Sequence, residues 1–268
     1  GMQAFSGCTK LASTNLSLLS NLTTIGNSAF WDCPLTSIDI PAKVASIGTS
    51  AFSPYKLTSI SVNSDNTVYE AVNNCLIKKP VSEGDFASLI VGSNQTSITI
   101  PDGVAIENSA FAGCNKIESL IFEGTYSIYQ YAFSNCTSLK DITIKSCTPR
   151  YFDKTNSFYG LTTKNIKLYV PAEYVDDYVD GDYSWNIFDI YVLPGESAKF
   201  NLVFKADGET VSTVPVEYRQ EISESNYPVA PEKVGHTFSQ WTGVPTTMPA
   251  KDVEVTAKYT VNSYTITY

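Results

Sequence analysis

Apolar and polar residues alternate in short stretches that return along much of the chain. The pattern Leu-x-x-Ile-x-Ile occurs with Leu35, Ile38 and Ile40, and related copies begin at Leu57, Ile117 and Leu139. Strict alternation predicts a short strand with one buried face. Because the strands recur at the same place in successive units, they are expected to pair in parallel, roughly 4.8 Å apart.

A second string accompanies each strand and sets the length of the unit. It is Ala-Phe-x-x-Cys, with Tyr55 in the cysteine position of the third copy, and the copies begin at Ala4, Ala29, Ala51, Ala110 and Ala132. Their phenylalanines are 25, 22, 59 and 22 residues apart. A period in the low twenties indicates a solenoid, in which each unit buries its apolar side against its neighbours.

The remaining positions of the unit fit this fold. Pro41 and Pro101 follow the alternating stretches and end the strands, since proline lacks an amide donor. Gly26 and Gly48 indicate tight turns, and Ala-Phe-x-x-Cys is expected to form a short helical turn or an irregular segment on the opposite, convex side. Leu11, Thr14 and Leu16 fill the strand slots of the first unit.

The complete unit resembles the repeat of BspA-like leucine-rich-repeat surface proteins of bacteria over residues 1–197. Ile40-Pro41 and Ile100-Pro101 stand where most leucine-rich repeats have Asn or Cys, so no asparagine ladder is expected. The resemblance implies an extracellular protein of the bacterial cell surface. Gly1 falls on the Gly26 position of the repeat, so the chain is expected to be a fragment of a longer protein, unless Gly1 is an expression scar.

The wide spacing between the third and fourth copies holds an insertion over residues 63–95. Residues 68–77 and 88–91 predict added strands around turn residues. Two interpretations remain open, a loop packed on the edge of the solenoid and a protrusion that contacts a ligand.

The periodic pattern fades after Cys147, and residues 148–197 are expected to form a cap that closes the solenoid. Pro171 precedes a predicted helix over 172–179, and Gly181 follows it. Trp185, Ile187, Phe188 and Ile190 complete an aromatic-rich block.

Beyond Pro194 the composition changes to longer alternating strands around 200–204, 209–218 and 253–259. The segment Pro231-x-Lys233-x-Gly235-His236-x-Phe238-x-x-Trp241 follows the pattern Pro-x-Lys-x-Gly-Tyr-x-Phe-x-x-Trp, with His236 in the tyrosine slot. By this pattern, residues 198–262 resemble a Listeria–Bacteroides (internalin-type B) repeat. The resemblance implies a small β-grasp-like module. Residues 263–268 repeat its first strand and are expected to begin a further, truncated copy.

Charge and cysteine content narrow the function classes. The net charge of −9 over 268 residues disfavours nucleic acid and anionic membranes as partners. Four of the six cysteines (Cys8, Cys33, Cys114 and Cys136) share one repeat position, which also accepts Tyr55, so they are expected to be buried thiols. Disulfides between neighbouring units remain an alternative. The acidic cluster Asp176, Asp177, Asp180 and Asp182 does not fit the EF-hand template and is interpreted as a solvated helix end, with calcium binding as the alternative.

Candidate catalytic chemistry is sparse. His236 is the one histidine, and no nucleophile elbow, P-loop, dinucleotide fingerprint or histidine-containing metal motif occurs. We therefore predict no enzyme activity, no catalytic residues, no cofactor and no metal. A carbohydrate-active enzyme, with paired carboxylates, is a remote alternative.

The outward positions of the stacked strands are the predicted ligand-binding residues: Asn15, Asp39, Ser61, Thr99, Ile121 and Thr143. They suit recognition of a host or matrix protein or a glycan by a monomer without membrane insertion. The alternative function is a structural stalk or spacer. A patch of exposed aromatic side chains on one face of the solenoid would favour binding.

Overall fold

The computed structural model of the chain describes residues 1–82, 84–124, 126–145, 150, 152–153, 155–181 and 183–266. The chain divides into two compact units, Gly1–Leu193 and Pro194–Tyr268. The change in composition along the sequence predicts this division at residue 197. Each unit has a hydrophobic core of its own.

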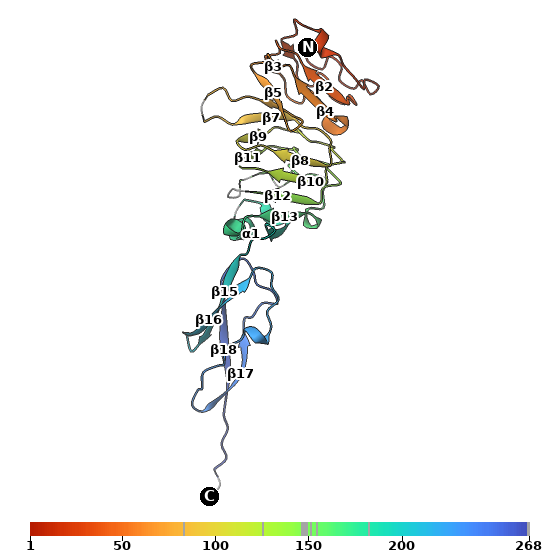
Figure 1. Ribbon diagram of the computed structural model, residues 1–268. Helices are drawn as coiled ribbons and strands as arrows, with labels where there is room; N and C mark the ends of the chain where they lie inside the picture. The colour runs from red at the N-terminus through yellow and green to blue at the C-terminus, as the bar shows by residue number, and fades with distance from the viewer. Residues whose placement is uncertain are drawn as a thin grey trace. The chain divides into compact units, whose positions relative to one another are not determined.

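Unit 1 contains the predicted stack of parallel strands, whose outward side we call the repeat-strand face. The stack consists of a pair, β2 (Ser37–Ile40) and β4 (Ser59–Val62), and a five-stranded sheet (Figure 1). The five strands, in spatial order, are β8 (Ser97–Ile100), β10 (Ser119–Phe122), β12 (Asp141–Ile144), β13 (Lys167–Val170) and β14 (Asp189–Val192). All four pairings in this sheet are parallel and each strand buries one side, as the alternation predicts.

A second ladder of strands, which was not predicted from the sequence, runs beside the first (Figure 1). It comprises the pair β1 (Thr24–Ile25) and β3 (Ser46–Ile47) and the strands β7 (Ala87–Val91), β9 (Val104–Ile106) and β11 (Tyr126–Ile128). Ile25 of this ladder shares one core with Ile38 of the first. Both ladders therefore enclose the same apolar interior.

Four of the five Ala-Phe-x-x-Cys strings form a turn that contains two left-handed residues. The residue before the alanine has a positive φ in all five copies: Gln3, Ser28, Ser50, Ser109 and Tyr131. The residue before the cysteine does the same in four copies: Gly7, Asp32, Gly113 and Asn135. Pro54 fixes a negative φ in the remaining copy, which forms the 3-10 helix η2 (Pro54–Lys56) instead.

The phenylalanines of these strings stack ring on ring in two columns. Phe5, Phe30 and Phe52 lie 5.1 and 5.5 Å apart between ring centroids, and Phe111 lies 5.1 Å from Phe133. Phe30, Phe52, Phe111 and Phe133 are buried, as predicted. Phe158 continues the second column at 5.3 Å, so residues 157–161 form a sixth, degenerate copy of the string.

Gly26 and Gly48 each precede a turn, but neither has a positive φ. Glycine is required there by close packing between neighbouring units. A Cβ on Gly48 would lie 2.1 Å from Oδ1 of Asn27, in the unit before it.

The insertion over 63–95 forms strands packed on the solenoid. β5 (Tyr69–Val72) and β6 (Cys75–Lys78) form a hairpin, β6 pairs antiparallel with β7, and β7 joins β9 in parallel. The buried Tyr69 ties the hairpin to the preceding unit, because its hydroxyl accepts a hydrogen bond from the Ile47 amide at 2.8 Å. The insertion is thus an extension of the second ladder.

The segment expected as a cap first extends the sheet and then closes it. β13 and β14 add two strands, and the 3-10 helix η3 (Thr163–Asn165) precedes β13. The predicted helix is present as η4 (Ala172–Tyr174) followed by α1 (Val175–Asp180). Trp185, in η5 (Trp185–Ile187), is buried against Phe152 and Tyr178, with ring centroids 4.6 and 5.9 Å away. Positions 148, 149, 151, 154 and 182 of the predicted cap, and Cys147 before it, lie outside the described residues.

The prediction of a strand at Leu11, Thr14 and Leu16 in the first repeat is wrong. Residues Leu16–Leu18 form the 3-10 helix η1, and Asn15 precedes it. The first repeat carries three more residues than the next, two of them between Leu16 and Leu22, where the chain forms η1 instead of a strand. Leu16 is nevertheless buried against the core.

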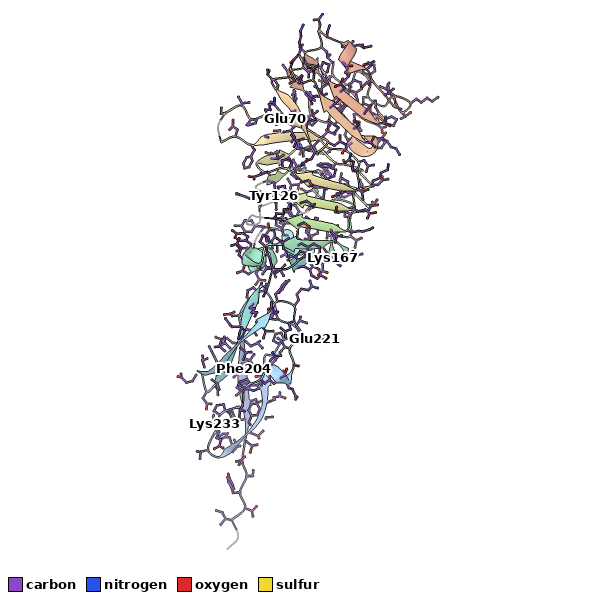
Figure 2. The ribbon with its side chains drawn as sticks, viewed as in Figure 1. Glu70, Tyr126, Lys167, Phe204, Glu221 and Lys233 are labelled. Atoms are coloured by element: carbon purple, nitrogen blue, oxygen red, sulfur yellow. The ribbon has the colours of Figure 1, made fainter. Side chains whose placement is uncertain are left out.

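Unit 2 is a four-stranded mixed sheet in the order β16-β15-β18-β17. Its strands are β15 (Lys199–Ala206), β16 (Glu209–Glu217), β17 (His236–Thr242) and β18 (Val253–Val261), with the 3-10 helix η6 (Glu224–Asn226) between β16 and β17. β15 pairs antiparallel with β16 and parallel with β18. Phe204, labelled in Figure 2, packs on Trp241 at 4.9 Å between ring centroids in the core of this unit.

Candidate binding surface

The predicted ligand-binding residues fall into two groups and an outlier. Asp39 and Ser61 are register partners on β2 and β4, and the Ser61 hydroxyl donates to the Asp39 carboxylate at 2.9 Å. Thr99, Ile121 and Thr143 are register partners on β8, β10 and β12. Asn15 lies outside both groups, because it precedes η1 and is not on a strand.

The turn of the β5–β6 hairpin occupies the space between the two groups. The Asn74 side chain accepts from the Ile60 amide and donates to the Thr58 carbonyl, both at 2.7 Å. The neighbouring Asn73 donates to the Thr99 carbonyl at 3.2 Å. These side-chain amides make hydrogen bonds to backbone groups at the facing edges of β4 and β8, as a paired strand would. The repeat-strand face is therefore built in two parts that the hairpin turn joins.

The five-stranded part ends in an aromatic and charged cluster that the sequence analysis missed. Thr143 is in register with Tyr169, which is in register with Tyr191. The two tyrosine rings lie 5.6 Å apart between centroids, and the Lys167 ammonium is 5.8 Å from the centre of the Tyr191 ring. The Tyr191 hydroxyl donates to the Asp189 carboxylate at 2.8 Å. We call Lys167, Tyr169, Asp189 and Tyr191 the tyrosine cluster.

The tyrosine cluster could have been found from the sequence. Lys167-Leu168-Tyr169-Val170-Pro171 carries the same alternation and the same closing proline as the segment 37–41. The absence of an Ala-Phe-x-x-Cys string nearby concealed the two extra strands. Figure 2 labels Lys167 on β13, the strand that begins this extension.

Charged pairs flank the five-stranded sheet on both sides. Lys140 and Glu118, just ahead of β12 and β10, are 2.8 Å apart, and Lys145 and Glu123, just after them, are 2.9 Å apart. All four side chains are largely exposed, so each pair contributes little to stability. The pairs border the repeat-strand face with charges that are locally balanced.

The repeat cysteines Cys33, Cys114 and Cys136 and the insertion cysteine Cys75 are buried, whereas the first repeat cysteine is not. Cys33, Cys75, Cys114 and Cys136 are buried free thiols, whereas Cys8 is exposed, which corrects the expectation that all four repeat cysteines are internal. The turn that contains Cys8 contacts the following copy of the string, because the amides of Phe5 and Gly7 donate to the carbonyls of Ala29 and Trp31, both at 2.8 Å. Burial raises the pKa of Cys136 to about 12, partly offset by a hydrogen bond from the Cys114 backbone, and burial also raises the pKa of Cys114. Thiols held in the protonated form are poor nucleophiles and poor metal ligands.

The other candidate groups show no assembled chemistry. Among the described residues, no group of three or more His, Cys, Asp or Glu side chains is placed to hold a metal ion. The His236 ring lies at the start of β17, with Nδ1 3.0 Å from the Val234 carbonyl oxygen. Asp182 of the acidic cluster lies outside the described residues.

These observations define a leucine-rich-repeat solenoid followed by a small mixed-sheet module. The model of the BspA-type leucine-rich-repeat region matches residues 1–91 and 89–179 in six copies, so the chain belongs to this family. The match does not extend to unit 2. A comparison with curated proteins found no match. Within the described residues, no helix is long and apolar enough to cross a membrane.

Similar solved structures come from three bacterial proteins. A leucine-rich cell-surface protein of Faecalibacterium prausnitzii is 26% identical, with a TM-score of 0.42 over 66% of this chain and 52% of its own. The pneumococcal vaccine antigen PcpA is 17% identical, with a TM-score of 0.36 over 64% and 60%. A leucine-rich-repeat protein of Eubacterium ventriosum is 19% identical, with a TM-score of 0.34 over 68% and 54%. This chain thus spans between about half and three fifths of their length.

Proposed function

We propose that this chain is a non-enzymatic binding and adhesion protein of the bacterial cell surface that recognises a host or matrix macromolecule through the repeat-strand face. Membership of the BspA-type family supports a surface role. The shape of the parallel stack supports binding, because it presents the same position of successive units on one side.

The observation that carries the proposal is the tyrosine cluster at the end of the five-stranded sheet. Tyr169 and Tyr191 are half-buried, and their rings are fixed by a neighbouring strand, by Lys167 and by Asp189. Tyrosines held in this way lose little conformational entropy when a partner covers them, and tyrosine is enriched in the energetic centre of interfaces. A face used only as a spacer has no need of such a cluster.

The chemistry around the cluster favours a protein partner. Asp141, Lys167 and Asp189 are register partners, so their charges alternate in sign across three strands. Alternating charge around a pair of tyrosines is suited to the mixed polar surface of a folded protein. A sheet of five strands also offers the area that protein interfaces need.

The resemblance of residues 198–262 to an internalin-type B repeat supports a display role for unit 2. Its mixed sheet, with β15 and β18 parallel at the centre, is compatible with a β-grasp-like module. We propose that this module holds the solenoid away from the cell surface.

The test is capture of the chain by immobilised extracellular-matrix proteins and glycans, measured by surface plasmon resonance. The variant Tyr169→Ala/Tyr191→Ala should bind at least about tenfold more weakly, the loss typical of an interface centre. Tyr129→Ala is the control, because this exposed tyrosine follows β11 of the second ladder and is not on the repeat-strand face. A wild-type chain that captures nothing across the panel favours the spacer function, and equal binding by both variants moves the contact away from the cluster.

A further inference from the structure

One repeat of the solenoid is shorter than its neighbours between its strand in the second ladder and the repeat strand that follows. Leu89 is in register with Ile106 on the second ladder and corresponds to Ile47 of the third unit. The path from Leu89 to Ile98 is four residues shorter than the path from Ile47 to Ile60. The missing residues are those of the Ala-Phe-x-x-Cys string, so the short unit has no turn of that kind.

A groove of about 400 Å³ lies where the missing turn leaves the stack incomplete. Trp31, Asp32, Ser53 and Tyr55 line it from the units before the gap. Ser109, Gly113, Tyr131, Ser134 and Asn135 are among the residues that line it from the units after the gap. We call this cavity the short-unit groove, and its volume is within the range of small-molecule sites.

The three aromatic residues of the short-unit groove are departures from the repeat. Trp31 occupies a slot that Ser6, Ser53, Ala112 and Ser134 fill in the other Ala-Phe copies. Tyr131 stands where the other copies have serine or glutamine, and Tyr55 replaces the buried cysteine. Trp31 and Tyr131 remain 39% and 42% exposed, so their rings are not needed to fill the core. Their presence at one groove indicates a ligand.

The groove is held in shape by buried contacts across the gap. The buried Asn94 of the short unit donates to the Tyr55 carbonyl at 2.6 Å and accepts from the Lys116 amide at 2.8 Å. The Gly92 amide donates to the Ala110 carbonyl at 2.9 Å, and a Cβ on Gly92 would lie 1.8 Å from the Phe111 ring. Tyr131 has a φ of 58°, a left-handed conformation that is costly for a bulky residue.

We propose that the short-unit groove binds a neutral oligosaccharide. Exposed tryptophan and tyrosine rings offer flat faces to the C–H face of a sugar ring. The Asp32 carboxylate and the side chains of Ser53, Ser109, Ser134 and Asn135 supply acceptors and donors suited to sugar hydroxyls. An aromatic wall with a few placed polar groups is the usual composition of a site for a polar ligand of this size.

The same lining disfavours other ligand classes. No lysine or arginine is among the residues that line the groove, and the chain carries a net charge of −9, so an acidic glycan or a phosphate is not matched. An extended peptide needs a row of unpaired backbone groups. Around the groove, the Asp32 amide donates to Ser53 Oγ at 2.7 Å. The amides of Gly113 and Asn135 donate to the carbonyls of Ser134 and Tyr159, both at 2.8 Å. These backbone donors are therefore already used within the protein, which disfavours a peptide.

Tryptophan fluorescence provides the test, because Trp185 and Trp241 are buried and Trp31 is exposed. The full chain would be titrated with maltotriose, cellotriose, mannotriose and tri-N-acetylchitotriose, and calorimetry would repeat any response. At least one of these neutral sugars is expected to give a saturable change in emission. Trp31→Ser and Tyr131→Ser restore residues that the repeat itself uses at those slots, and each should weaken binding about tenfold or more. Because Trp31→Ser removes the reporter, its affinity is measured by calorimetry.

The controls separate this proposal from the proposed function. Tyr169→Ala/Tyr191→Ala should leave sugar binding unchanged, and Trp31→Ser should leave capture of a matrix protein unchanged. Either proposal can then fail alone. The groove proposal is overturned if no neutral sugar binds, if binding survives both serine variants, or if only heparin or sialylated glycans bind.

Discussion

Phe5 and Phe111 occupy the same position of the same string, but their environments differ completely. Phe111 is fully buried, whereas Phe5 is 48% exposed. Cys8 and Cys114 show the same contrast, since only Cys114 is buried. Phe111 lies in a stack with the short unit before it and Phe133 after it, and among the described rings Phe5 stacks on Phe30.

The comparison shows that in this solenoid the neighbouring unit, and not the string alone, buries a residue. The backbone turns of the two copies are alike, because Gln3 and Ser109 both have positive φ and so do Gly7 and Gly113. Local sequence therefore determines the turn, and the stack determines the burial. This is the behaviour expected of a quasi-one-dimensional fold.

The largest expected effect is the stability difference between the two phenylalanines. Phe111→Ala should lower the free energy of unfolding by about 3–5 kcal/mol, as for a fully buried aromatic residue. Phe5→Ala should cost about 1 kcal/mol or less, since half of its ring already faces solvent. Urea unfolding followed by circular dichroism measures both, and equal losses would refute the role of the neighbouring unit.

Asn94 tests whether the short unit is held by its buried amide. Asn94→Ala leaves the Tyr55 carbonyl and the Lys116 amide without their partner, which should cost about 1–3 kcal/mol of stability. The exposed Asn108→Ala is the control and should change stability by no more than about 0.5 kcal/mol. If both substitutions had the same small effect in urea unfolding, the hydrogen bonds of the Asn94 side chain across the gap would not contribute to the free energy of unfolding.

The buried thiols predict a loss of stability at high pH. Desolvation by burial raises the pKa of Cys75 and Cys136 from 9.0 to about 12, with a smaller opposing effect from backbone hydrogen bonds. The unfolded chain releases these protons near pH 9 and the folded chain retains them. Their stabilising contribution is therefore complete below pH 9 and is lost as the pH rises toward 12.

Each thiol should add a slope of up to about 1.4 kcal/mol per pH unit to the free energy of unfolding in this range. Thermal unfolding of the wild type and of Cys75→Ala/Cys136→Ala at a series of pH values measures the difference. The double variant should have a lower Tm at neutral pH but a flatter decline above pH 9. Parallel declines would mean that these thiols titrate normally in the folded chain.

Repetition made much of the fold predictable. The strands β2, β4, β8, β10 and β12 and the buried phenylalanines follow from periodicity, because every repeat carries the same pattern of apolar residues. The helix over 172–179 was predicted instead from Pro171 before it and Gly181 after it. Long-range events were not predictable in this way. The pairing of β13 with β14, the entry of β7 into the second ladder and the asparagine turn between β4 and β8 depend on segments without the repeat string.

The candidate sites show the same division. Asp39, Ser61, Thr99, Ile121 and Thr143 lie on strands where the register predicts them, but Asn15 does not, because its repeat has inserted residues and the segment after it forms η1. Tyr169 and Tyr191 were missed because their strands lie beyond the last clear string. The short-unit groove was missed because its signal is a string that is absent between Phe52 and Phe111.

Thiol labelling tests the central claim, that position in the stack decides burial, most directly. Native protein would be treated with N-ethylmaleimide at pH 7.5 in the absence of reductant, and each cysteine would be quantified by mass spectrometry against the unfolded chain. Cys8 is expected to react at a rate close to that of the unfolded chain, whereas Cys33, Cys75, Cys114 and Cys136 should remain protected. Labelling of Cys114 or Cys136 as fast as Cys8 would contradict the account, because the same string would then be equally open in the middle of the stack and at its edge.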